Sequence, residues 1–202
     1  MIGRWFKREH RPTAERYIVR EIAVDVINTR PDIPTDLALT RLDAALALIE
    51  RYQPWRLRHL GRDIAGVLVT AFPSRGAYFP AQRIIVTELS FLGRTAEFTP
   101  AEIASSILHE GVHARIDRMR TTLQLDQRPP DRAREERICR RAELAFGQAL
   151  PPAVGEPVMR RALDSLALGD AEVAPAVDWD AAQRVKAKAD QEAIDAWRRA
   201  HS

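Results

Sequence analysis

Short runs rich in valine and isoleucine predict strands in the first half of the chain. Residues 64–71 and 83–87 are such runs, and residues 73–81 between them contain proline, glycine and serine, which predict a loop. The segment 12–28 fits two elements, because its apolar residues satisfy both the spacing of a helix and the alternation of a strand. Those residues are Ile18, Ile22, Val24 and Val26, and the pattern leaves the choice open.

Apolar residues at every third or fourth position predict five helices elsewhere. The best marked begins at Thr-Pro-Ala-Glu, in which Thr99 and Glu102 form the capping-box pattern. Thr35 or Asp36 can cap the first predicted helix, and Asp131 can cap another. The helices cover about residues 35–53, 99–118, 131–150, 156–168 and 178–200. The buried stripe predicted for the third of them is Ile138, Ala142, Ala145 and Ala149.

The composition is that of a single soluble domain. The chain has 202 residues, 46% apolar and 29% charged, and no apolar run approaches the roughly 20 residues of a membrane helix. The elements predict an α+β fold, mainly helical with a small sheet, in one domain over residues 1–202 with a helical appendage at 155–202. The first eight residues lack the apolar core of a secretory leader and Cys139 has no partner cysteine, so we expect a cytoplasmic protein.

The charge distribution argues against a nucleic-acid partner. The 31 basic and 28 acidic side chains leave a net charge of +3. Basic residues gather in residues 56–62 and 132–141, but acidic residues are interleaved in the second group and neither group resembles a nucleic-acid motif. We therefore expect solvated helix faces there and neither nucleic acid nor a membrane as partner, while the oligomeric state stays open.

The helix predicted at 99–118 carries the sequence His-Glu-x-x-His. Two histidines four residues apart lie on one helix face, so both imidazoles can bind a single divalent ion. Glu110, next to the first histidine, is placed where it can take a proton from a water molecule that the ion activates. His109 and His113 are thus the candidate metal ligands, and Glu110 is the candidate general base.

Two ordinary hydrogen-bonded histidines on a half-exposed helix are the alternative to a metal site. The composition gives roughly 0.01 chance matches to the motif in a chain of this length. Burying two imidazoles and a carboxylate on an apolar helix without a partner would also be unfavourable. The metal site is therefore the preferred hypothesis for His109 and His113.

With this motif the chain resembles the zincin metallopeptidases. A metzincin has a third histidine six residues after the second, but Met119 stands there, and Ile116 replaces the glycine of that motif. The resemblance is therefore to the gluzincins, whose third ligand is a glutamate on a later helix, here the one predicted at 131–150. It covers about residues 60–150 and implies a zincin-like fold, one Zn2+ per chain and hydrolysis of peptide bonds. It also implies that the run 83–87 belongs to a sheet whose edge lines the cleft and can pair with an extended substrate.

Three glutamates on that later helix are candidates for the third ligand. Glu136 fits best, because small uncharacterised metallopeptidase-like proteins have a glutamate two residues before an apolar residue, here Ile138, on a helix that ends in Leu-Pro. Glu143, seven residues later and on nearly the same face, is the alternative. Glu135 falls on the apolar stripe instead.

Two arginines depart from the family pattern. Arg115 stands where zincins carry an apolar residue, and Arg140 stands where the thermolysin type has an aspartate. The residues that orient the ligands are therefore not given by the resemblance. Asp117 can orient the second histidine, although a pair with Arg118 or Arg120 is the preferred interpretation.

Tyr78 and Cys139 are the remaining candidates. Tyr78 can donate a hydrogen bond to an oxyanion, but an exposed loop tyrosine is the expectation. Cys139 can line the site, but a small buried hydrophobe is the expectation. The sequence as a whole predicts a zinc-dependent metallopeptidase with a peptide or protein substrate. The alternative is a non-catalytic protein that binds zinc structurally or for regulation on an inactive zincin-like fold.

Overall fold

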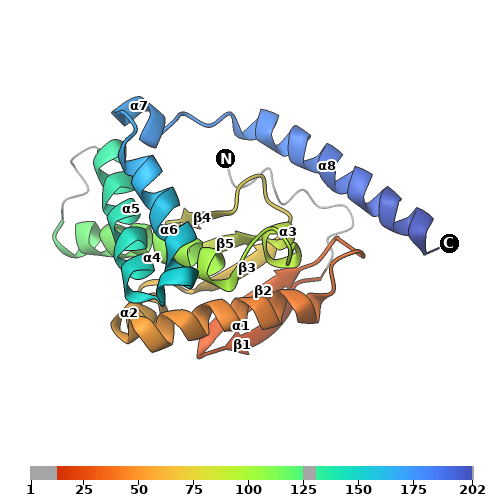
Figure 1. Ribbon diagram of the computed structural model, residues 1–202, viewed down its shortest axis with the longest axis horizontal. Coiled ribbons are helices and arrows are strands. Elements are labelled where there is room, and N and C mark those ends of the chain that lie inside the picture. Colours follow the sequence, from red (N-terminus) through yellow and green to blue (C-terminus); the bar gives the residue numbers. More distant parts are fainter. Residues whose placement is uncertain (1–12, 125–130, 202) are drawn as a thin grey trace.

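The computed structural model describes residues 13–124 and 131–201 (Figure 1). The first eight residues, where no secretory leader is predicted, and the prolines 129 and 130 before a predicted helix lie outside the described residues. Among the described residues, the helices are all too short or too polar to cross a membrane. The architecture is α+β, with one small mixed sheet and helices over most of the remaining chain.

A five-stranded sheet has the order β1-β2-β3-β5-β4. Its strands are β1 (Glu15–Val19), β2 (Ile22–Ile27), β3 (Gly66–Thr70), β4 (Gly76–Phe79) and β5 (Ile84–Glu88). The inner strands β2, β3 and β5 are parallel, while β1 and β4 are antiparallel edges. The strands predicted at 64–71 and 83–87 are confirmed as β3 and β5. The loop predicted at 73–81 is wrong in part, because it contains β4, which pairs with β5 and forms an edge of the sheet.

The ambiguous N-terminal segment is a β-hairpin. β1 and β2 pair up to Val19 and Ile22, so the connecting loop consists of Arg20 and Glu21 alone. These two residues have φ of 47° and 65°, as a two-residue hairpin loop of type I′ requires. Along β2 buried and half-buried positions alternate, so the strand pattern describes this segment and the helical spacing does not.

Helix α1 (Thr35–Tyr52) buries its predicted apolar stripe in the core. Leu42, Leu46 and Ile49 are fully buried in a cluster that includes the inward-facing residues of β2, β3 and β5. The predicted cap is wrong, because Pro34 occupies the cap position without a side-chain hydrogen bond. The hydroxyl of Thr35 instead accepts a hydrogen bond from the Asn28 side chain at 3.0 Å.

Helix α4 (Pro100–Thr122) is the central helix of the fold. Its predicted capping box is confirmed, because Thr99 and Glu102 exchange side-chain to backbone hydrogen bonds. α4 contacts α1, helix α2 (Pro54–Asp63), strands β4 and β5, and the two helices that follow it. The short helix α3 (Leu89–Gly93) connects β5 to the segment that leads into α4. The His-Glu-x-x-His motif therefore lies in the middle of the molecule.

Helices α5 (Arg132–Ala149) and α6 (Pro152–Leu166) pack beside α4 (Figure 1). Asp131 caps α5 as predicted, by accepting a hydrogen bond from the Arg134 backbone. The predicted buried stripe of α5 is wrong in part: Ala142 is buried, but Ile138 is 39% exposed and the other two alanines lie on the exposed side. The buried residues are Cys139, Ala142, Glu143, Phe146 and Gly147. Two polar side chains thus occupy the face that α5 turns towards α4.

The chain ends in the short helix α7 (Asp170–Val173) and the long helix α8 (Trp179–Ala200). The helices predicted at 156–168 and 178–200 are confirmed as α6 and α8. Figure 1 shows α8 reaching away from the bundle of α4, α5 and α6. α8 has no buried residue. Ion pairs connect it to the rest of the molecule: Lys186 lies 2.9 Å from Glu88, and Arg30 pairs with Asp190.

Candidate metal centre

His109 and His113 lie one turn apart on the face of α4 that meets α5. Their ring centroids are 5.0 Å apart. His109 is 7% exposed and His113 is half-buried. The capping box fixes the start of α4 nearly three turns earlier, so the helix presents both imidazoles side by side, as their spacing in the sequence predicts.

Glu136 reaches from α5 to both histidines. One carboxylate oxygen, Oε2, lies 3.1 Å from Nε2 of His109, and the other, Oε1, lies 3.3 Å from Nε2 of His113. The Nε2 atoms of two imidazoles and one carboxylate therefore converge on a single small region. Glu136 and His113 are both half-buried, so this region is partly shielded from water.

Glu143 contacts the opposite side of the His109 ring. Its Oε1 lies 2.5 Å from Nδ1 of His109 and 2.7 Å from the guanidinium of Arg140, while its Oε2 accepts a hydrogen bond of 3.0 Å from Ser105. Glu143 is 1% exposed. The two glutamates that the sequence offers as alternatives thus both contact His109, through different ring nitrogens.

The charges of His109, Glu136 and Glu143 stabilise one another. Burial opposes protonation of His109, but its hydrogen bonds to Glu136 and Glu143 outweigh burial and raise the pKa of His109 to about 9. Burial likewise opposes ionisation of the two glutamates, yet the hydrogen bonds from the histidines keep the pKa of Glu136 and that of Glu143 below the ordinary value. Without a metal, a proton on His109 compensates the negative charge of the site.

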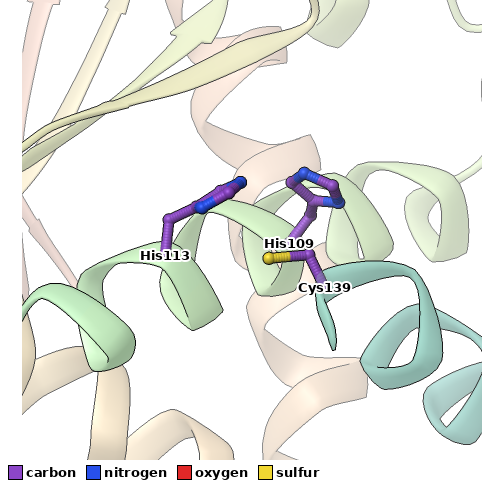
Figure 2. A group of neighbouring side chains, drawn as sticks. All are labelled: His109, His113 and Cys139. Atoms are coloured by element: carbon purple, nitrogen blue, oxygen red, sulfur yellow. The ribbon is translucent and has the colours of Figure 1, made fainter. Parts of the chain in front are cut away.

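Cys139 lies between the two glutamates on the same face of α5. Its sulfur and one nitrogen of each histidine lie within 4.8 Å of one another, and Figure 2 shows the side chain beside both rings. Cys139 is fully buried, and burial together with the neighbouring glutamates raises the pKa of its thiol. Both of its sequence interpretations apply, since it packs with Val112 and Ala142 and also lines the site.

Glu110 lies on α4 next to the edge strand β4. A Cβ atom on Gly76 of β4 would lie 3.4 Å from Cγ of Glu110 and 3.2 Å from the carbonyl oxygen of Val86. The glycine therefore leaves room for the Glu110 side chain against the strand. In the described part of the chain, no hydrogen bond or ion pair engages the Glu110 carboxylate, which leaves it available as a proton acceptor.

Tyr78 and Asp117 form a hydrogen bond that the sequence analysis does not predict. The Tyr78 hydroxyl donates to Oδ2 of Asp117 at 3.0 Å, and Tyr78 is a half-buried residue of β4 rather than an exposed loop residue. Arg118 and Arg120, the predicted partners of Asp117, pair with other carboxylates. This hydrogen bond joins the edge strand to α4 one turn beyond the second histidine.

Comparisons with protein-family models, with curated proteins and with solved structures find no match to this chain. The functional assignment therefore depends on the geometry of the site. Ser105 is a residue of the candidate site that the sequence does not predict, and for Cys139 the sequence favours a buried hydrophobe over a place in the site. A signal for Cys139 was present, because Glu136, Cys139 and Glu143 have the i, i+3, i+7 spacing of one helix face.

Proposed function

We propose that the protein is a zinc-dependent metallopeptidase that hydrolyses peptide bonds. The observation that carries the proposal is the convergence of the two Nε2 atoms of His109 and His113 on the carboxylate of Glu136. Two histidines and one glutamate are the ligand set of many catalytic zinc sites, which keep a fourth position for water or substrate. In this proposal Glu136 is the third ligand and Glu143 is not a ligand.

The spacing of the donor atoms fits a zinc ion. Ligand atoms about 2.0–2.1 Å from a tetrahedral zinc ion lie about 3.3 Å from one another. The two nitrogen–oxygen distances to Glu136 are 3.1 and 3.3 Å, so small side-chain rotations would bring all three donors to a common centre. The surrounding charge also fits a dication, because the carboxylates of Glu110, Glu136 and Glu143 face two imidazoles.

Glu143 is the residue that orients the first histidine. Metal-binding histidines commonly donate their other ring N–H to a carboxylate, which fixes the tautomer and the ring orientation. Glu143 accepts such a bond at Nδ1 of His109, so Nε2, which faces Glu136, is the nitrogen that would bind a metal. Ser105 and Arg140 hold the Glu143 carboxylate in turn.

Glu110 is the proposed general base. A bound zinc ion would lower the pKa of a water molecule and polarise the substrate carbonyl. Glu110 would take the proton of the attacking water and deliver it to the amine that leaves. Its position next to His109 on α4 supports this role, as does a carboxylate that forms no hydrogen bond or ion pair with any residue of 13–124 or 131–201.

The edge strand β4 is the proposed binding surface for the peptide. β4 pairs only with β5 among the described strands, so the backbone groups of its other side are available to an extended chain. Because Gly76 of β4 adjoins Glu110, a peptide paired along this edge would pass close to the general base. The edge of the sheet that contains the run 83–87 is thus β4, and β4 is the strand with which the substrate would pair.

The substitution Glu110→Gln tests the proposed function. The zinc-loaded wild type should cleave peptides in a proteome-derived mixture, as detected by mass spectrometry, and the variant should be slower by at least about 100-fold with its zinc content unchanged. Glu97→Gln, which changes an exposed glutamate paired with Arg94, is the matched control and should cleave at the wild-type rate. Wild-type cleavage that persists in Glu110→Gln, or no cleavage by the wild type, would contradict the proposal.

A further inference from the structure

Among the described residues, Cys139 is a buried side chain near the histidines that has a metal-binding atom and no role in the proposed reaction. It is the only cysteine of the chain. It lies one turn after Glu136 on α5 and is fully buried. Its sulfur, one nitrogen of His109 and one nitrogen of His113 all lie within 4.8 Å of one another.

The sulfur of Cys139 lies close to the position of an ion that both histidines would bind. A zinc ion binds thiolate sulfur at about 2.3 Å and imidazole nitrogen at about 2.0–2.1 Å, so a sulfur and a nitrogen on one tetrahedral ion are about 3.5 Å apart. In this structure the sulfur and the two histidine nitrogens lie within 4.8 Å of one another. Rotation of the Cys139 side chain, or a shift of α5 by about 1 Å, would shorten the sulfur–nitrogen distances enough for all three atoms to bind one ion. A thiolate is also a strong ligand for zinc and cobalt.

We propose that Cys139 is a fourth protein ligand of the metal and that it holds the site in a closed, latent form. This inference rests on the metal site proposed above. With His109, His113, Glu136 and Cys139 all bound, no position is left for water, which is typical of structural zinc sites rather than catalytic ones. On binding, the thiol loses its proton to solvent. On opening, the sulfur leaves the metal, regains a proton from solvent and returns to the apolar contacts with Val112 and Ala142, while a neutral water molecule takes the vacated position.

The closed form reconciles two features of the site. The histidine and glutamate set with a neighbouring Glu110 suits hydrolysis, whereas a fully buried thiol beside the same histidines suits permanent coordination. A site that exchanges Cys139 for water would be inactive at rest and would open when a substrate on the β4 edge displaces α5 or rotates the cysteine. Loss of the sulfur should therefore make the enzyme more active, not less.

Cobalt substitution tests the proposal directly, because a thiolate bound to Co2+ gives a charge-transfer band in the near ultraviolet. The chain has a single cysteine, so any such band must arise from Cys139. We expect the band in the wild type loaded with one equivalent of Co2+, its loss in Cys139→Ser at equal cobalt content, and its retention in Glu135→Gln. Glu135 is the matched control because it lies on α5 and pairs with Arg120.

X-ray absorption at the zinc edge of the wild type provides a second measurement that needs no variant. One sulfur at about 2.3 Å from zinc is the expected result. Full metal loading of the wild type without a thiolate band and without a zinc–sulfur distance would overturn the proposal while leaving the metal site intact. If the wild type binds neither ion, the proposed metal site itself falls, and the inference falls with it.

Discussion

Glu143 and Glu136 hold the imidazole of His109 from opposite sides. Glu143 contacts Nδ1 at 2.5 Å and Glu136 contacts Nε2 at 3.1 Å. Both carboxylates come from α5, seven residues and therefore two turns apart, whereas the histidine comes from α4. The ring is thus fixed in the orientation in which its Nε2 faces the other donors, before any metal binds.

The substitution Glu143→Gln should weaken metal binding without abolishing it. The amide keeps the size of the side chain but removes the charge that orients His109, and loss of such an outer partner typically lowers metal affinity about 10–100-fold. Competition between the protein and a chromophoric chelator measures the zinc affinity. Glu135→Gln serves as the control, since Glu135 lies on the same helix and contacts neither histidine. Equal affinities in the two variants would show that Glu143 has no orienting role.

The stability of the metal-free protein should depend on pH through this cluster. The pKa of His109 is raised from 6.5 to about 9, so its contribution to the free energy of unfolding is complete below pH 6.5 and is lost as the pH rises towards 9. The pKa values of Glu136 and Glu143 are lowered from 4.5, so their contribution is present above pH 4.5 and is lost as the pH falls below it. The cluster should therefore stabilise the metal-free protein most between pH 4.5 and 6.5.

Thermal unfolding of chelator-treated protein between pH 5 and 9 checks this dependence. The wild type should lose stability above pH 6.5 more steeply than His109→Gln, which lacks the titrating group. With zinc present the trend should reverse, because the metal must displace the proton from His109 and binds better as the pH rises. Parallel curves for the metal-free wild type and His109→Gln would contradict the assigned pKa.

Attachment of α8 should depend on its ion pairs. Arg30 is 4% exposed and pairs with both Asp32 and Asp190, and Lys186 contacts Glu88. Since α8 buries no residue, Asp190→Asn should speed amide hydrogen exchange in α8 by at least about tenfold, whereas exchange in α1 stays unchanged.

Glu192→Gln is the control for that experiment. Glu192 lies on α8 only two residues from Asp190, but its partner Lys188 is exposed and 3.9 Å away. An exposed pair of this kind contributes little, so the variant should exchange like the wild type. Equal exchange in both variants would mean that other contacts, such as that of Trp179 with Phe72, hold the helix.

The sequence predicted those elements of the fold that depend on interactions between residues close together in the chain. The capping box at Thr99 and the apolar stripe of α1 each gave an element with its approximate limits. The N-terminal hairpin stayed ambiguous because its loop, Arg20 and Glu21, lacks the asparagine or glycine that favours positive φ. β4 was missed because it is four residues long and flanked by prolines, and it forms only by pairing with β5.

The sequence predicted the site residues of α4 well and those of α5 less well. His109, Glu110 and His113 follow from one motif on one helix, so their positions depend on helix geometry alone. The positions of Glu136 and Glu143 depend on how α5 packs against α4, which the apolar stripe misrepresented: the interface buries Cys139 and Glu143 and exposes Ile138. Burial of a helix face is predicted from its apolar residues, and a polar site on a buried face interrupts that apolar pattern.

Elemental analysis of metal bound to the purified protein tests the central claim most directly. The wild type should hold one zinc per chain, and His109→Ala, His113→Ala and Glu136→Ala should each lose it. Glu110→Gln and the control His59→Ala, whose imidazole packs on Trp55 of α2, should keep it. A wild type that stays free of metal after zinc is supplied, or that keeps zinc in His109→Ala and His113→Ala, would contradict the account.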